Sequence, residues 1–203
     1  MKTSTSYAGS ADTLRRVSDF AYKPTLTGEL VVLRPVDEGD YEALSVAMDD
    51  PDVRRLTGSH GEIGEERARE WYRTRNDQTD RLDLAIVDKA AGVVVGEAVL
   101  NDWDPDNQCC NFRILIGPAG QGRGLGTEAT RLIVGYGIEK LGLHRISLGV
   151  YAFNPRAQRA YEKAGFTTEG VLRDALLWDG EWVDEIVMSV LAQDWVPSER
   201  DPS

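Results

Sequence analysis

The chain has 203 residues, 41% of them hydrophobic, and a formal net charge of −11 at pH 7. This length suits one domain with a substantial core, and the acidic balance argues against nucleic acid as a partner while favouring a cationic or amine substrate. No apolar run approaches the ~18 residues of a membrane span and the N-terminus lacks the apolar segment of a signal peptide, so we expect a cytoplasmic protein without a membrane partner.

The first half of the chain predicts two helices followed by a run of strands. Residues 1–24 are rich in Ser, Thr and charge and show no sustained period, which indicates a flexible tail or arm. The loop at 56–64 holds three glycines, and we expect it to form the rim of a substrate site. Periodicity and turn residues predict a strand at 30–35, helices at 38–48 and 65–76, and an antiparallel meander of strands at 83–88, 93–100 and 109–116.

A glycine-rich stretch from Pro118 to Ala129 follows the last of these strands. Its four glycines within seven residues allow positive φ, so that backbone N–H groups can converge on one point. The helix expected at 127–141 adds unpaired N–H groups and the positive end of its dipole. We predict that this loop binds a pyrophosphate. The alternative is a surface turn that only caps the helix.

Two known phosphate-binding loops fit this stretch incompletely. The pattern Gly124-x-Gly126-x-x-Ala129 satisfies the dinucleotide fingerprint, but that fingerprint also needs an acidic residue about 20 positions on, after the next strand. That strand ends instead in Asn154-Pro155. A Walker A loop needs Gly-Lys-Ser/Thr, which is absent. The pattern that remains is Gln121-x-x-Gly124-x-Gly126 after a strand.

The rest of the chain predicts, in order, a strand at 145–153, a helix at 154–164 and a hairpin of strands at 170–178 and 181–191. The first of these strands should run parallel to the strand before the glycine-rich stretch, because a helix connects the two. Asn154-Pro155 suits the N-cap and first position of a helix, and Asp179-Gly180 is typical of a type I′ turn. Without a repeat or a linker, we expect one domain at 25–195 and a tail at 196–203.

Cysteines and histidines give no sign of a metal site. Cys109 and Cys110 are adjacent, which is neither a metal-binding nor a redox spacing and supplies no disulfide framework. His60 and His144 are far apart, and no ligand pattern surrounds them. We therefore predict no bound metal.

The predicted elements come in the order of a strand, a Gln-x-x-Gly-x-Gly loop, a helix, a strand, a helix with the pattern Asn-x-x-Ala-x-x-x-Tyr-x-x-x-Gly-Phe, and a hairpin. This order resembles the GCN5-related N-acetyltransferase (GNAT) family across about residues 25 to 195. Within the family, Pro118, the Gly-Thr-Glu-Ala helix start, Glu169-Gly170-x-x-Arg173 and Asp184 resemble the ribosomal-protein N-terminal (RimJ/RimL-like) branch. The resemblance implies an α/β (α+β) fold: a central, mixed, mostly antiparallel, splayed sheet of about seven strands flanked by about four helices.

The resemblance also implies a binding mode for acetyl-CoA. The co-substrate would lie in the gap between the diverging strands, with backbone groups of the first strand holding the acyl-pantetheine arm and loop amides holding the pyrophosphate. Arg123 would be available as a further positive charge. The implied cofactor-binding residues are Ile114, Leu115, Ile116, Gln121, Gly122, Arg123, Gly124, Leu125, Gly126, Thr127, Asn154 and Tyr161.

Tyr161 matches the position at which many family members use a tyrosine as general acid toward the departing CoA sulfur, although its spacing equally suits a core residue. The branch commonly has a glutamate where this chain has Asn111 and a serine where it has Ala157, and neither replacement can transfer a proton. Candidate bases are therefore Glu97 and Asp102. Water relayed to bulk is an equal alternative, and both carboxylates also fit solvated surface positions.

Two acidic residues on the last strand are adjacent in sequence. Asp184 and Glu185 alternate across that strand, so one of them should face the acceptor cleft. Pairing with Arg173 across the hairpin is the simpler account.

Transfer of an acyl group from a thioester to an amine needs a neutral amine, a stabilised oxyanion and a proton for the leaving thiolate. We predict an enzyme that transfers acetyl from acetyl-CoA to a primary amine by direct attack in a ternary complex. A protein N-terminus, a polyamine, an aminoglycoside or another small amine all fit as acceptor. The alternative is a non-catalytic acyl-CoA-binding regulatory module, and a homodimer through the last strands or the N-terminal arm also fits.

Overall fold

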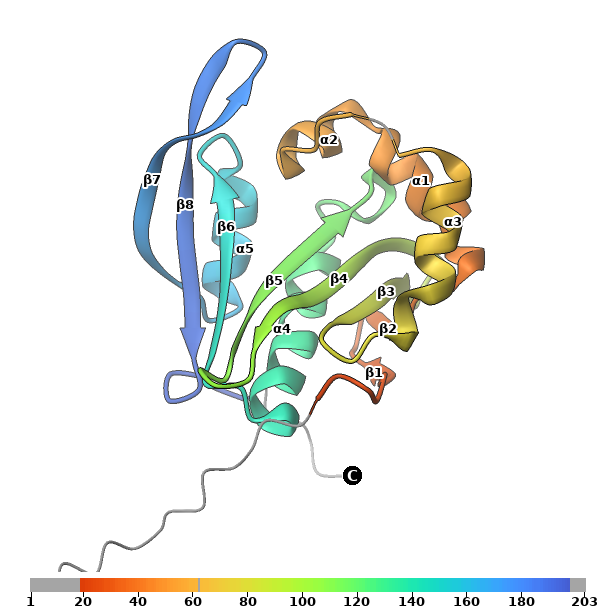
Figure 1. Ribbon diagram of the computed structural model, residues 1–203, viewed down its shortest axis with the longest axis horizontal. Helices are drawn as coiled ribbons and strands as arrows, with labels where there is room; N and C mark the ends of the chain where they lie inside the picture. Colours follow the sequence, from red (N-terminus) through yellow and green to blue (C-terminus); the bar gives the residue numbers. More distant parts are fainter. Residues whose placement is uncertain (1–18, 62, 198–203) are drawn as a thin grey trace, which may run out of the picture.

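One sheet of eight strands organises the chain, in the strand order β1-β2-β3-β4-β5-β6-β8-β7 (Figure 1). The computed structural model describes residues 19–61 and 63–197. Its strands are β1 (Leu26–Thr27), β2 (Val31–Pro35), β3 (Leu82–Asp88), β4 (Val93–Asp104), β5 (Cys109–Ile116), β6 (Arg145–Tyr151), β7 (Thr167–Trp178) and β8 (Glu181–Leu191). Neighbouring strands are antiparallel except β5 and β6, which are parallel. The predicted mixed, mostly antiparallel sheet is confirmed.

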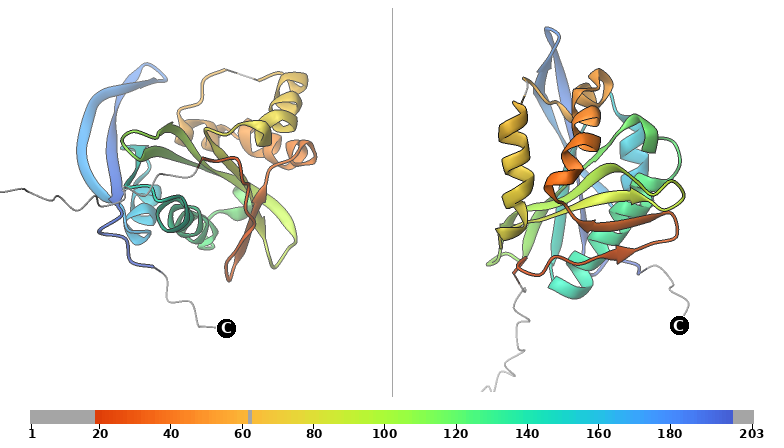
Figure 2. Two further views of the ribbon diagram at one scale, coloured as in Figure 1. Left: turned by 60° about the horizontal axis from the view of Figure 1, so that its bottom comes forward. Right: turned by 90° about the vertical axis from the view of Figure 1, so that its right-hand side faces the viewer.

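Helices cover both faces of the sheet (Figure 2). They are α1 (Tyr41–Asp49), α2 (Pro51–Thr57), α3 (Glu65–Thr74), α4 (Leu125–Tyr136) and α5 (Pro155–Lys163), and a π-helical turn at Gly137–Leu141 extends α4. On the α4 side, Leu125 and Ile133 pack against Phe112 of β5 in the main core. On the other side, Leu44 of α1 and Tyr72 of α3 form a smaller core. We call these two sides of the sheet the α4 face and the α3 face.

The described chain holds eight strands and five α-helices, where the sequence predicts about seven and about four. The extra strand is the two-residue β1. The extra helix is α2, because Pro51 starts a new helix instead of only ending the previous one. Proline costs little at the first helical position, whose N–H would be unpaired in any case. The side chain of Asp50 caps this helix by accepting a hydrogen bond from the Val53 N–H at 2.9 Å.

The N-terminal boundary of the packed domain lies earlier than residue 25. Phe20 is fully buried, and its ring meets Trp103 edge-on with centroids 5.5 Å apart. The amino group of Lys23 donates to the backbone carbonyls of Gln78 and Arg81 at 2.6 and 2.7 Å. Residues 1–18, which hold most of the predicted tail or arm, and residues 198–203 lie outside the described part of the chain.

The start of α4 is fastened to the turn between β1 and β2. The carboxylate of Glu128 accepts hydrogen bonds from three successive backbone N–H groups, those of Glu29, Leu30 and Val31, at 2.7 to 2.8 Å. Gly28 allows this approach, because a β carbon there would lie 2.6 Å from the Glu128 carboxyl carbon. The contact fixes where the N-terminus of α4 sits relative to the sheet. In residues 19–61 and 63–197, no helix is both long and apolar enough to cross a membrane.

Candidate active site

Strands β5 and β6 separate after a short paired segment. Their pairing ends at Asn111 and Ser147, three residues into each strand, whereas β5 continues to Ile116 and β6 to Tyr151. Beyond that point the edge of β5 facing β6 has no strand partner in the described chain. Apart from the Ile116 carbonyl, which accepts a hydrogen bond from the Gln121 side chain, the N–H and C=O groups on this edge are available to an extended ligand, as on any open sheet edge. The predicted contacts to the acyl-pantetheine arm, 114–116, lie on this segment.

The glycine-rich loop sits at the end of β5 and leads into α4. Gly122 and Gly124 have φ values of +74° and +82°, which L side chains rarely adopt, and Gly124 is the N-cap residue of α4. Leu125 anchors the helix start in the core, being only 2% exposed, while Gly126 and Thr127 form the first turn. The loop therefore has the positive φ values and the helix N-terminus from which the sequence predicts an anion site.

Two side chains of the loop are held by other parts of the protein. Gln121 donates from Nε2 to the Ile116 carbonyl at 3.1 Å and accepts at Oε1 from the Arg156 guanidinium at 2.8 Å. Arg123 donates to a carboxylate oxygen of Asp88 at 2.6 Å. The interpretation of Arg123 as a spare positive charge needs correction, because its guanidinium already has a partner. Its backbone N–H remains part of the predicted site.

Helix α5 carries the other predicted contacts. Asn154 caps it as expected, accepting from the Ala157 N–H at 3.1 Å. Tyr161 packs edge-on against Phe112 of β5 and lies beside Phe166, with ring centroids 6.2 and 6.1 Å away. Burial raises the pKa of Tyr161 to about 12. Because of this raised pKa, the hydroxyl is protonated at neutral pH. No described residue hydrogen-bonds it, so it is free to donate to a ligand.

Glu97, the first candidate base, is buried. It lies beneath α3, is 7% exposed, and accepts a 3.2 Å hydrogen bond from the Tyr72 hydroxyl. Its burial, and next the negative charge of Asp83, raise the pKa of Glu97 to about 8. Tyr72 and the sheet thus enclose the Glu97 side chain, and its role as a base stays a prediction.

Asp102, the second candidate base, lies at a bulge in β4, where the register with β5 shifts between Asn101 and Asp104. Its φ is +52° and its side chain is exposed. This position is next to the paired start of β5, away from the open segment. Asn111 donates to Asn101 at 3.3 Å, and neither amide can transfer a proton.

On the α3 face, one carboxylate leans across β6 toward the gap. Glu185 of β8 pairs with Tyr151 of β6, and a β carbon on Gly149 would lie 2.6 Å from the Glu185 carboxyl carbon. The neighbouring Asp184 instead accepts from the Asp174 N–H at 3.0 Å. Of the two residues from which the sequence predicts one that faces the acceptor cleft, Glu185 is the one that lies over Gly149 of β6. The described residues contain no ion pair between either carboxylate and Arg173.

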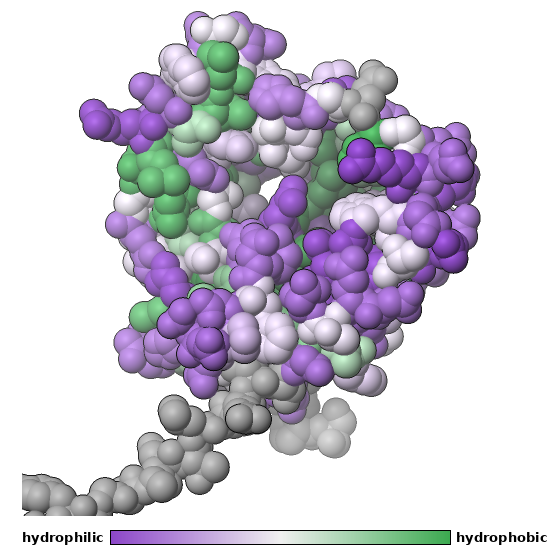
Figure 3. Space-filling view, viewed as in Figure 1, coloured by the Kyte–Doolittle hydropathy of each residue, from purple (hydrophilic) through white to green (hydrophobic). Residues whose placement is uncertain are grey.

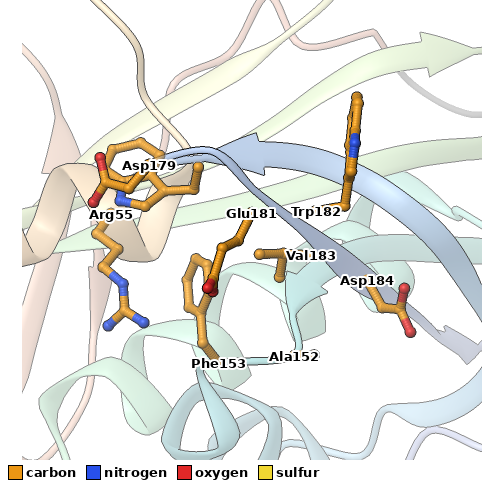
Figure 4. Close-up of a pocket in the computed structure, with 9 residues that line it drawn as sticks. Arg55, Ala152, Phe153, Asp179, Glu181, Trp182, Val183 and Asp184 are labelled. Atoms are coloured by element: carbon orange, nitrogen blue, oxygen red, sulfur yellow. The ribbon is translucent and has the colours of Figure 1, made fainter.

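A cavity of about 470 Å³, which we call the hairpin pocket, opens beside the turn of β7 and β8. Arg55 comes from α2 and the other lining residues from the loop after β6 and the hairpin (Figure 4). These residues are Arg55, Ala152, Phe153, Trp178, Asp179, Glu181, Trp182, Val183 and Asp184. The surface is hollowed between the hairpin and α2, and mostly hydrophilic side chains surround the hollow (Figure 3).

Helix α2 and the loop that follows it contact the end of β6, the loop after β6 and the β7–β8 hairpin. The Arg55 guanidinium lies 4.4 Å from the centre of the Phe153 ring. His60 and Trp178 place their rings 5.0 Å apart, and Gly58 lies against the Tyr151 ring. The loop predicted at 56–64, whose first two residues belong to α2, thus contacts the hairpin and the end of β6; its role as the rim of a substrate site stays a prediction. Sequence analysis missed Arg55 and Phe153, because only the tertiary contact brings them together.

The described residues contain no group of three or more His, Cys, Asp or Glu side chains placed to hold a metal ion. Cys109 and Cys110 are free thiols. Cys110 is buried, and its burial raises the pKa of the thiol.

Comparison with known proteins gives a family and several relatives. The family model described as acetyltransferase (GNAT) domain matches residues 31–167. The probable N-acetyltransferase YjcK of Bacillus subtilis (strain 168) is 43% identical over 80 residues, which cover 39% of this chain but only 44% of that relative. Spermidine N(1)-acetyltransferase of Escherichia coli (strain K12) is 29% identical over 127 residues, which cover 63% of this chain and 67% of the relative.

The fold also matches solved structures. Spermidine N-acetyltransferase from Vibrio cholerae, whose crystal structure is a complex with CoA and spermine, superposes with a TM-score of 0.76 at 23% sequence identity. The superposition covers 82% of this chain and 98% of that chain. At this identity the similarity supports the fold alone.

Proposed function

The chain belongs to the GNAT acetyltransferase family, whose acetyl donor is acetyl-CoA, and on that premise we propose that it acetylates a primary amine by direct attack in a ternary complex. The observation that carries this proposal is the gap between β5 and β6. An open strand edge, a helix N-terminus with a glycine-rich loop and an unpartnered tyrosine hydroxyl all border that gap.

Acetyl-CoA binds along this gap in our proposal. The unpaired edge of β5 at 114–116 bonds the acyl-pantetheine arm, as a strand would. The backbone N–H groups of the loop from Gln121 to Gly126, together with the first turn of α4, receive the pyrophosphate. Asn154 and Tyr161 border the same gap from α5. The positive φ of Gly122 and Gly124 supports this assignment, because it turns successive N–H groups toward one side.

Tyr161 acts as the general acid in this proposal. When the amine attacks the thioester carbonyl, the C–S bond breaks and the leaving sulfur needs a proton. A tyrosine whose pKa is raised to about 12 keeps its proton at neutral pH. Its hydroxyl has no partner in the described chain, so it is available to the sulfur.

The hairpin pocket favours a positively charged acceptor. Asp179, Glu181 and Asp184 line it against one cation, Arg55, and Glu185 lies nearby on β8. The aromatic faces of Phe153 and Trp178 add sites for cation–π contacts. Among the acceptors that fit the sequence, an amine with a second positive charge, such as the polyamine spermidine, suits this lining best.

A thiol-release assay tests the proposal. Acetyl-CoA is incubated with spermidine, a peptide that begins with alanine, or an aminoglycoside, and free CoA is measured with and without protein. We expect acceptor-dependent release, largest with spermidine, and acetylated acceptor in equal amount by mass spectrometry. Binding of acetyl-CoA without release over the whole panel would instead favour the acyl-CoA-binding regulatory module, which the Asn111 and Ala157 replacements motivate.

A further inference from the structure

We propose that Glu185 is the catalytic residue that takes the proton from the acceptor's ammonium group before attack; this inference rests on the proposed N-acetyltransferase function. The reason is its position on the wall of the gap between β5 and β6. Neither Glu97 nor Asp102, the candidate bases from the sequence, lies on this wall of the gap.

Gly149 is what allows Glu185 to reach the gap. Glu185 lies on β8, and β6 stands between β8 and the gap. Gly149 is the second β6 residue after Ser147, where the pairing with β5 ends, so it lies beside the open segment. A β carbon on Gly149 would come within 2.6 Å of the Glu185 carboxyl carbon and 3.1 Å of its Cγ. The missing side chain therefore leaves room for the carboxylate to lie across β6.

Strand register places Glu185 and Tyr161 on opposite sides of the gap. On β6, Leu148 and Val150 belong to the main core on the α4 face, which Tyr161 also joins. Side chains alternate along a strand, so Gly149 and Tyr151 face the other way, together with Glu185 opposite Tyr151. The general acid thus lies on the α4 face and the base on the α3 face. This arrangement suits an acetyl donor and an amine acceptor that enter the gap from opposite faces of the sheet.

The groups that face Glu185 come from both walls of the gap. Tyr151 lies on β6, and its pKa is raised first by burial and then by the negative charge of Glu185. Arg113, on the open segment of β5, acts on the pKa of the same tyrosine with the opposite sign. β7 places the uncharged Leu172 opposite Glu185. The titratable or charged groups named around Glu185 are thus one phenol and one guanidinium.

Neighbouring carboxylates are occupied elsewhere. Glu97 is enclosed under Tyr72, and Asp184 accepts from the Asp174 N–H at 3.0 Å. Glu185 has no hydrogen-bond partner in residues 19–61 and 63–197. It is therefore the carboxylate on this wall that is free to bind an ammonium.

The proton balance of the step is complete. The ammonium R–NH₃⁺ gives one proton to the Glu185 carboxylate and becomes R–NH₂, whose lone pair attacks the thioester carbonyl carbon. The C–S bond then breaks, its electron pair leaves with sulfur, and the sulfur takes the Tyr161 proton. The acetylated nitrogen still carries one excess proton, which returns to the tyrosinate through water. Glu185 finally releases its proton to solvent.

The test compares Glu185→Gln with wild type over pH and over two acceptors. The first acceptor is spermidine, with alkylammonium groups of pKa about 10, and the second is an alanine peptide, whose α-amino pKa is about 8. Without a base, the variant depends on amine that is already neutral in solution. We expect its kcat/KM with spermidine to fall about 100-fold at pH 7, and the deficit to narrow toward pH 9. With the peptide the deficit is smaller.

Three controls separate catalysis from structure. Asp106→Asn removes one charge from the exposed turn between β4 and β5, at the opposite end of β5, and should behave as wild type. Acetyl-CoA affinity and Tm of Glu185→Gln should match wild type. Gly149→Ala keeps the Glu185 side chain but displaces its carboxylate. It should lower activity with the same narrowing of the deficit as pH rises.

Each outcome decides the proposal. A loss in Glu185→Gln that narrows with pH supports it. Wild-type rates in this variant, or a loss that is equal at every pH and for both acceptors, would overturn it while the proposed function stands. A wild-type protein that releases no CoA with either acceptor would overturn both.

Discussion

The guanidinium of Arg123 in the glycine-rich loop donates a hydrogen bond of 2.6 Å to the carboxylate of Asp88, at the end of β3. Asp88 is almost fully buried, and Arg123 is the main reason that its pKa is lowered. A second bond from Arg123 reaches the Ala119 carbonyl at 3.3 Å. The pair thus ties the proposed pyrophosphate loop to the sheet, and we expect Arg123 to affect acetyl-CoA binding through the position of the loop.

Arg123→Met should weaken both the fold and acetyl-CoA binding. It leaves the buried Asp88 carboxylate with backbone donors alone, such as the Ala90 N–H at 3.0 Å. A buried charge that loses its partner costs about 1–3 kcal/mol, and urea unfolding measures this loss. Asp88→Asn is the matched variant, and it should destabilise less because no charge is left unpaired. Equal stability of Arg123→Met and wild type would contradict the tie.

Gly124→Val should abolish most acetyl-CoA binding. The φ of +82° at Gly124 strains any L residue, and valine more than most. The loop would have to change shape, which moves the N–H groups that receive the pyrophosphate. Gly142→Val is the control, because Gly142 has a φ of +78° at the other end of the same helical segment. If calorimetric titration gave the Gly124 variant normal affinity, the loop assignment would be lost.

Tyr161→Phe should lower kcat about 100-fold or more, the size expected for a general acid, and leave the Kd for acetyl-CoA nearly unchanged. The ring keeps its packing on Phe112 and Phe166, so stability changes little. Tyr136→Phe provides a control on α4, where the tyrosine also packs against the main core. Unchanged turnover in Tyr161→Phe would assign the residue to the core alone.

Glu97→Gln should become more stable than wild type as pH rises. Glu97 has a pKa near 8 in the folded protein, raised from 4.5, so its contribution is fully present below pH about 4.5 and is lost as pH rises toward 8. The loss is at most about 1.4 kcal/mol per pH unit. The groups that face Glu97 are Tyr72 of α3, Asp83 of β3 and Arg81, which directly precedes β3. Glutamine cannot ionise, so this pH dependence disappears.

Urea unfolding at pH 5, 7 and 9 measures this effect. The stability difference between Glu97→Gln and wild type should shift in favour of the variant from pH 5 to pH 7, and change little above pH 8. A difference that is constant over the whole range would mean that Glu97 is ionised in the folded protein at every pH.

Local signals in the sequence predicted much of this fold. The bounds of β5 agree with the prediction because an apolar run ends at a proline and glycine stretch. Asn154 caps its helix, and Asp179-Gly180 turns the hairpin with both φ values positive. Such features depend on residues that are neighbours in the sequence. The GNAT motifs are also short runs of neighbouring residues, so they too can be found from the sequence.

The features that sequence could not predict depend on contacts between distant segments. Alternation alone could not decide whether Asp184 or Glu185 faces the gap, because that requires the register of β8 on β6 and the space above Gly149. Glu97 looked like a strand carboxylate on a solvated face until α3 placed Tyr72 over it. Phe20 lies in a segment without a sustained period, and its burial depends on packing against distant residues such as Trp103.

Isothermal titration of acetyl-CoA into the wild-type protein tests the central claim, that the gap between β5 and β6 with its glycine-rich loop is an acetyl-CoA site. We predict saturable binding of one acetyl-CoA per chain, weakened when the pyrophosphate is removed, as with S-acetyl-pantetheine. A titration without any binding heat, over a range of temperatures, would contradict the account.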